Sequence, residues 1–107
     1  MVSIEGYAPV TVNHPELLRK MLPTLAWAAG DDKLIDGAVV MGAEDFSFFQ
    51  ERIPGLFLHL CVYDPSNPRS DRPANHTPFI NADDAALITG VITLVGFAKD
   101  YASVAAD

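Results

Sequence analysis

The chain has 107 residues, of which half are hydrophobic and a fifth are charged, so it fits one small globular domain and not a wholly disordered chain. Fourteen acidic against seven basic residues give a formal net charge of -7. That balance argues against nucleic acid as a partner, because phosphate binding needs a basic surface. The single cysteine, Cys61, cannot form an internal disulfide, and its apolar neighbours in LFLHLCV predict a buried, unreactive thiol.

No export or membrane signal is expected. The N-terminal sequence MVSIEGYAPV lacks a basic region followed by a long apolar stretch, so we expect no signal peptide. The apolar run ALITGVITLVGFA has about thirteen residues, which is shorter than the roughly 20 that a bilayer-spanning helix needs. The sequence therefore predicts a cytoplasmic protein with no membrane partner.

The chain begins with a predicted strand and a predicted helix. Apolar and polar residues alternate over residues 2–10, which is typical of a half-buried strand near a sheet edge. Asn13 then stands where a helix N-cap is expected, and Pro15 suits the first turn. Apolar residues follow at steps of three and four, as in an amphipathic helix. Pro23 is expected to kink or split this helix, and Gly30 to end it.

Two more strands and a short helix are predicted next. Residues 34–41 are predicted to form a strand, and Glu44 and Asp45 open a short helix, where the helix dipole favours acidic side chains. Residues 56–62 form a continuous apolar run, which is typical of a strand buried on both faces. His59 lies inside that run, so we expect a core histidine with a backbone partner.

A long loop and a final helix complete the predicted order. Residues 63–78 contain four prolines and few apolar side chains, and loops of this length are usually functional or mobile. Asn81 is expected to cap a helix that runs to about Ala102, with Asp83 and Asp84 in its first turn. The alternation of strands and helices predicts an α/β fold with parallel crossovers.

His76 is the leading candidate for chemistry, because the sequence contains no Gly-rich phosphate loop and no CxxC, GxSxG or HExxH motif. The loop before it starts at the carboxyl end of the 56–62 strand, where open α/β sheets bind their ligands. Neutral imidazole is also a common zinc ligand. The alternative is a loop histidine that bonds a backbone carbonyl, and residue type alone favours that alternative.

The remaining polar candidates each have a structural alternative. Glu44 and Asp45 follow a predicted strand and could support a cationic centre, or could only complement the helix dipole. His14, at the start of the first helix, is expected to be structural or solvated. Arg69 and Arg72 could bind a carboxylate through paired hydrogen bonds, with solvated loop charges as the default interpretation.

Four motifs in a fixed order carry a resemblance to a known family. They are GYAPVTVNHPELL, MGAEDFSFF, IPGLFLHL and NHTPFINADDAAL, and a closing apolar helix follows them. Together they resemble the C-terminal end of the aminoacylase and carboxypeptidase family of dinuclear metallohydrolases. The most similar branch is the amidohydrolases that include hippurate hydrolase, auxin-conjugate hydrolase and N-acyl-amino-acid amidohydrolase. The resemblance covers nearly the whole chain.

The resemblance implies a domain organisation. Residues 13–107 would be the C-terminal part of a three-layer α/β catalytic domain, and residues 1–12 the last strand of an inserted lid domain that often dimerises. Asp83 and Asp84 match the acidic start of the family's last helix, and we keep the capping interpretation for them. Cys61 departs from the glycine that the resemblance leads us to expect at that position.

The resemblance also implies the site residues and cofactors. His76 stands where the family places a ligand to one of two divalent metal ions, which would be zinc, manganese or cobalt. Glu44 and Asp45 match an acidic pair near the active site, with a supporting role. The other metal ligands and the glutamate that activates water have no counterpart in this chain, so the site is incomplete and no catalytic residue is assigned here.

We therefore interpret the chain as a segment of a metal-dependent amidohydrolase that cleaves the amide bond of N-acyl amino acids and is inactive by itself. An unpaired strand edge and an apolar final helix lead us to expect a homo-oligomer. The alternative is a stand-alone α/β binding or interaction module that performs no chemistry.

Overall fold

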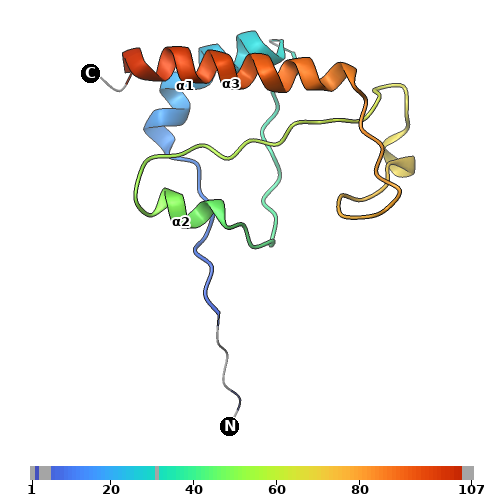
Figure 1. The fold of residues 1–107 in the computed structure, drawn as a ribbon, viewed down its shortest axis with the longest axis horizontal. Coiled ribbons are helices and arrows are strands. Elements are labelled where there is room, and N and C mark those ends of the chain that lie inside the picture. Colours follow the sequence, from blue (N-terminus) through green and yellow to red (C-terminus); the bar gives the residue numbers. More distant parts are fainter. Residues whose placement is uncertain (1, 3–5, 31, 105–107) are drawn as a thin grey trace.

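The computed structural model describes residues 2, 6–30 and 32–104. Its regular elements are helix α1 (Pro15–Ala29), the short helix α2 (Phe46–Gln50), the single-turn 3-10 helix η1 (Arg69–Asp71) and the long helix α3 (Ala85–Val104). Figure 1 shows α3 along one edge of the molecule, α1 beside it, and α2 on the other side of an extended segment that runs along α3.

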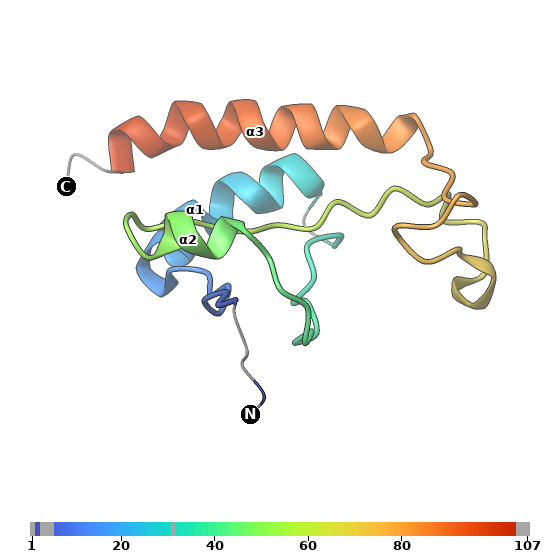
Figure 2. The same ribbon diagram turned by 60° about the horizontal axis from the view of Figure 1, so that its bottom comes forward.

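The described chain is open and thin. Its radius of gyration is 16.4 Å and its principal extents are 53 × 44 × 19 Å. A compact domain of this length has a radius of gyration of about 13 Å. Figure 2 shows the consequence, because the loop before α3 extends well beyond the region where α1 and α2 lie.

Helix α1 forms where the sequence predicted it, one residue away from the expected cap. His14 is the N-cap, since its Nδ1 accepts a hydrogen bond from the Leu17 amide at 3.2 Å. Pro15 occupies the first turn, as expected, and Gly30 ends the helix with a φ of 92°. Pro23 does not split the helix, which remains one element and changes direction along its length (Figures 1 and 2).

The core lies between α1 and α3. Leu17, Met21 and Leu25 of α1 are the buried apolar side chains of the described part. Thr24 lies on the same side of α1, and its hydroxyl donates to Asp100 Oδ2 of α3 at 2.6 Å. Gly96 lets the two helices approach, because a Cβ at that position would be 3.1 Å from the Thr24 methyl carbon.

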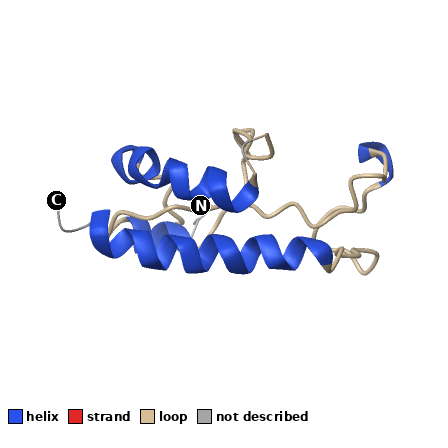
Figure 3. Cartoon of the chain, turned by 90° about the horizontal axis from the view of Figure 1, so that it is seen from above, coloured by secondary structure: helices blue, strands red, loops and turns tan. Residues whose placement is uncertain are grey.

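The α/β expectation is not confirmed, because the described residues form helices and loops and no strand (Figure 3). Residues 34–41 are irregular, and residues 56–62 are non-helical chain without a strand partner, so both predicted strands are wrong for this structure. A strand is stabilised by backbone hydrogen bonds to a neighbouring strand, and no described segment provides one. The strand predicted at residues 2–10 falls partly outside the described residues, at positions 3–5.

The Asn13 side chain bonds the backbone N–H and C=O of Phe57, as a neighbouring strand would bond those of several residues. Its side-chain Nδ2 donates to the Phe57 carbonyl at 3.1 Å, and its Oδ1 accepts from the Phe57 amide at 2.6 Å. The His14 amide next to it donates to the Gly55 carbonyl at 3.1 Å. Asn13 is therefore not the helix cap that the sequence predicted, because its amide group is used to hold the 55–57 segment against the start of α1.

The 56–62 segment is less buried than expected. His59 and Cys61 are both exposed, so the predictions of a core histidine and a buried thiol are wrong for this structure. His59 instead meets the ring of Phe57 edge-on, with 5.2 Å between the ring centroids. Helix α3 lies against the segment at Leu60, because a Cβ at Gly90 would be 3.0 Å from the Leu60 Cδ2 atom. Helix α2 packs Phe46 on Phe57 at the start of the segment, with 5.8 Å between the ring centroids, and His59 and Cys61 stay uncovered.

Helix α3 begins at Ala85, four residues after the Asn81 cap that the sequence predicted. Asp83 occupies the capping role, because its Oδ1 accepts from the Ala85 amide at 3.0 Å, which confirms the capping interpretation of this aspartate. The helix is also longer than the apolar run within it. Residues 85–103 are long and apolar enough to cross a bilayer by length and composition, so the length argument against a membrane span does not hold.

The packing at Gly96 generates the first prediction. Gly96→Val adds a branched side chain that starts against Thr24, and we expect it to lower the free energy of unfolding by about 1–3 kcal/mol. Urea denaturation followed by helical circular dichroism measures this. Ala98→Val, at an exposed position of the same helix, is the control and should cost less than about 0.5 kcal/mol. Equal losses in the two variants would show that Gly96 is not a packing position.

Candidate functional site

The long loop that leads to His76 is held by its own side chains. The Tyr63 hydroxyl donates to the Pro73 carbonyl, which closes the loop across its base. The Arg72 guanidinium lies 5.7 Å from the centre of the Tyr63 ring, and it donates to the Asn67 carbonyl from Nε at 3.2 Å and from Nη2 at 3.0 Å. Residues 63–73 therefore form an organised loop, closed and braced by hydrogen bonds within it.

Of the two loop arginines, the structure describes the side-chain contacts of Arg72, and none of these is to a carboxylate. Arg72 donates to a backbone carbonyl and stacks near an aromatic ring, so its role in this structure is to order the loop. Arg69 begins η1, and its side chain lies outside the described part.

Asp64 starts the loop with a local turn. Its Oδ1 accepts from the Ser66 hydroxyl at 2.7 Å and from the Ser66 amide at 2.8 Å. These two hydrogen bonds, the hydroxyl first, hold the pKa of the Asp64 carboxyl below its ordinary value because they stabilise the charged form. The turn should therefore keep its hydrogen bonds at neutral pH and lose them as the carboxyl protonates in acid.

His76 occupies a strained position in a tight turn. Its backbone φ is 65°, and it is the one non-glycine residue with positive φ in the described part of the chain. The His76 amide donates to Asn75 Oδ1 at 3.0 Å, and the Thr77 hydroxyl donates across the turn to the Ala74 carbonyl at 2.9 Å. The imidazole itself is exposed.

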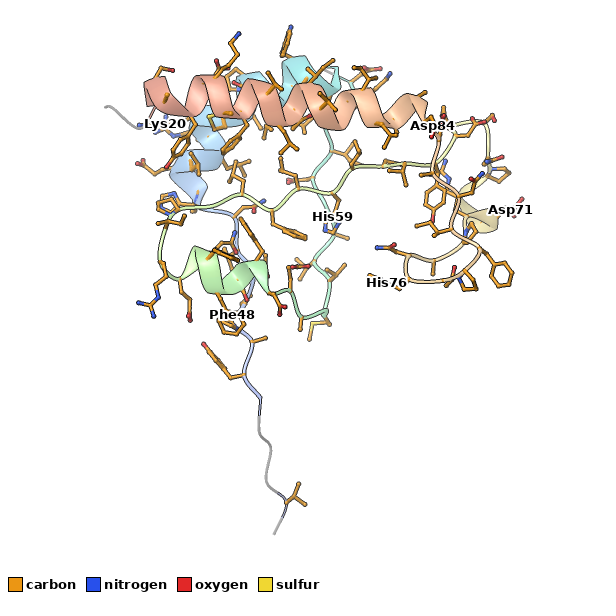
Figure 4. The ribbon with its side chains drawn as sticks, in the orientation of Figure 1. Lys20, Phe48, His59, Asp71, His76 and Asp84 are labelled. Carbon is orange, nitrogen blue, oxygen red and sulfur yellow. The ribbon has the colours of Figure 1, made fainter. Side chains whose placement is uncertain are left out.

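The His76 side chain fits the role of one metal ligand, but the chain does not supply a complete metal site. An exposed imidazole offers a nitrogen donor of the kind that zinc and related ions bind. Among the described residues, however, no group of three or more His, Cys, Asp and Glu side chains could hold a metal ion. Figure 4 shows why, since His76, His59 and Asp84 lie on separate segments.

The contacts of Glu44 and Asp45 are local to the start of α2. Glu44 Oε1 accepts from the Phe46 amide at 3.3 Å, and the Glu44 carbonyl accepts from the buried Ser47 hydroxyl at 2.6 Å. Asp45 is exposed and makes no side-chain capping bond, and α2 begins only at Phe46. Within this structure Glu44 holds the start of α2, Asp45 is the N-cap residue without a side-chain bond, and neither acid lies in the first turn as the sequence predicted.

The structure thus presents His76 as an exposed imidazole on a loop held by its own hydrogen bonds. Residues 1–100 match peptidase family M20/M25/M40. The chain belongs to this family. Members of the family are metal-dependent hydrolases with dinuclear sites, so the resemblance inferred from the four sequence motifs is confirmed at the level of the family.

Individual relatives match most of this chain but little of their own length. An IAA-amino acid hydrolase, ILR1-like 2 of Arabidopsis thaliana, is 31% identical over 87% of this chain and 20% of its own. An N-acetyldiaminopimelate deacetylase of Lacticaseibacillus paracasei is 32% identical over 86% of this chain and 22% of its own. A Rhodococcus jostii protein named as a glutamate–cysteine ligase is 32% identical over 90% of this chain and 12% of its own. No solved structure matches.

Sequence reasoning missed the residues that hold the loop and the turn. Tyr63 and Thr77 act by donating to the carbonyls of Pro73 and Ala74, and Asn75 acts by accepting from the His76 amide. The usable signals were weak: one aromatic residue at the start of a proline-rich loop, and a hydroxyl residue three positions after Ala74. Neither signal identifies a hydrogen-bond partner from the sequence alone.

The closure of the loop by Tyr63 generates the second prediction. Tyr63→Phe removes the hydroxyl that donates to Pro73, and we expect trypsin to cleave after Arg69 about two- to tenfold faster. Time courses of limited proteolysis measure this. Tyr7→Phe is the control, because the Tyr7 hydroxyl makes only an exposed 3.4 Å contact with Glu51. Unchanged cleavage of the Tyr63 variant would mean that the hydroxyl does not close the loop.

Proposed function

We propose that this chain is the segment of a metal-dependent amidohydrolase that contributes one metal ligand, His76, to an active site completed by the rest of the enzyme. The observation that carries the proposal is the family match over residues 1–100 together with the exposed imidazole on an organised loop. The complete enzyme would hydrolyse the amide bond of an N-acyl amino acid, including hippurate-like substrates. Its metal ions would be zinc, manganese or cobalt.

The names of two relatives support this substrate class. One is an IAA-amino acid hydrolase and the other an N-acetyldiaminopimelate deacetylase, and both names are compatible with cleavage of an amide between an acyl group and an amino acid. The relative named as a glutamate–cysteine ligase does not change the proposal, because this chain matches only 12% of that protein. The chain spans less than a quarter of each of these three relatives.

In this proposal the residues of the chain bind and orient, and they perform no chemical step themselves. The imidazole of His76 would coordinate one metal ion, and the bound metals would supply Lewis-acid activation of water and of the scissile carbonyl. The loop bonds at Tyr63 and Arg72 would hold the imidazole-bearing turn in place. Glu44 and Asp45 would lie near the assembled site as support. The proposed setting is cytoplasmic, without nucleic acid or membrane.

The alternative of a stand-alone binding module receives less support. A module that folds alone buries most of its large apolar side chains, whereas large apolar side chains of this chain are exposed along α3, the 34–41 segment and the N-terminal segment. The open shape of the described chain also argues against a module that folds alone.

The third prediction tests the proposed function directly. The full-length protein that carries this segment should hydrolyse N-acyl amino acids when supplied with zinc, manganese or cobalt, and His76→Ala should lower kcat/KM at least about 100-fold. The 107-residue chain alone should show no turnover under the same conditions. His14→Ala is the control, since His14 caps α1 and is not placed at the metals. Turnover by the short chain, or full activity without His76, would refute the proposal.

We also propose that the chain self-associates in solution through the exposed apolar face of α3, which includes Leu87, Val91 and Leu94. Leu94 is 73% exposed, and burial of such side chains between copies is favourable. The fourth prediction is that sedimentation velocity finds oligomers, and that Leu94→Lys shifts them toward monomer.

The control for this variant is Val39→Lys, which places the same charge at a residue that is 96% exposed outside the helix. It should leave the oligomer unchanged. A chain that is strictly monomeric and unfolds cooperatively would contradict self-association.

A further inference from the structure

The turn that carries His76 has an unusual residue at its strained position. Residues 74–77 form a tight turn in which the third residue, His76, has a φ of 65°. Turns with positive φ at the third residue are usually filled by glycine or asparagine there, because a Cβ is disfavoured in this conformation. Histidine adopts this conformation more often than most non-glycine residues but still at a cost, which contacts in the surrounding turn can offset.

Two side chains supply those contacts. The Thr77 hydroxyl donates to the Ala74 carbonyl at 2.9 Å, and this bond joins the first and last residues of the turn. Asn75 Oδ1 accepts the His76 amide at 3.0 Å, so the amide next to the strained φ has a partner. Pro78 follows directly and disfavours helical backbone at Thr77, which limits the conformations open to this residue.

We infer that Thr77 is a positioning residue for His76: its hydroxyl closes the 74–77 turn and so fixes the direction in which the imidazole leaves the loop. Asn75 assists by binding the His76 amide. The inference rests on the proposed function for its purpose, since a fixed direction matters only if the imidazole must meet a ligand. The turn itself can be examined in the 107-residue chain without that assumption.

The hydroxyl, and not the bulk of the side chain, is the feature that acts. Thr77→Val preserves the shape of the side chain and removes the donor, whereas Thr77→Ser preserves the donor and removes the methyl group. A purely packing role at this partly exposed position would be disturbed more by serine than by valine. A positioning role through the hydrogen bond predicts the opposite order.

The first arm of the test is nuclear magnetic resonance of the 107-residue chain. The wild type and Thr77→Ser should show the amide-to-Hα coupling of a positive φ at His76 and the same imidazole shifts. Thr77→Val should raise the ratio of open to closed turn about three- to tenfold, which moves both signals toward averaged values. His76→Gly should keep the turn closed in the Thr77→Val background. Indistinguishable spectra for Thr77→Val and wild type would overturn the inference.

The second arm measures metal content of the full-length protein after dialysis at limiting zinc, and not its activity. His76→Ala should lose one metal equivalent, Thr77→Val should bind that equivalent about three- to tenfold more weakly, and Thr77→Ser should bind it as the wild type does. If His76→Ala keeps both metals, the proposed function is wrong and the first arm still judges the turn. If His76→Ala loses a metal and Thr77→Val does not, the positioning role is wrong and the proposed function stands.

Discussion

The contact between α1 and α3 is the constraint on which the rest of the structure depends. The core side chains Leu17, Met21 and Leu25 all belong to α1, and α3 is the helix that packs against α1. The approach is possible because residue 96 is glycine, and it is fixed by the Thr24 hydroxyl on Asp100. The 55–57 segment is then tied to the start of α1 through Asn13 and His14, so the chain that leads into the His76 loop is anchored to the core at that point.

The helices could be predicted from the sequence because their signals are local. Pro15 in the first turn, apolar residues at steps of three and four, and Gly30 after the last turn place α1 almost to the residue. The apolar run and the aspartates before it also predict α3, but the helix begins later than expected, at Ala85, and Asp83 takes the capping role predicted for Asn81. The strands were not found because their stability is not local: an apolar run such as 56–62 becomes a strand only beside another strand, and the described chain offers Phe57 a single side-chain amide instead.

The candidate site could be predicted in part, for a similar reason. The choice of His76 followed from its place after a long loop and from the family resemblance, and the family is confirmed. The positive φ of His76 had no sequence signal. Glycine or asparagine normally marks such a position, and here the asparagine, Asn75, stands one residue before it. The remaining ligands could not be predicted at all, since a metal site is a property of side chains brought together in space, and the described residues bring no such group together.

The unpaired backbone of residues 56–62 and the exposed apolar face of α3 indicate what surrounds this segment in the complete protein. Among the described residues, only Phe57 and Val62 of the 56–62 segment have backbone hydrogen bonds, so this segment lacks a sheet neighbour. Helix α3 packs one face on α1 and leaves a second apolar face exposed, and a helix that is apolar on several sides is normally buried. A bilayer would cover α3 but would not pair the backbone of residues 56–62. A larger domain with strands beside residues 56–62 and with elements packed on α3 would pair the exposed backbone and bury the apolar helix face. The proposed larger enzyme would provide this arrangement.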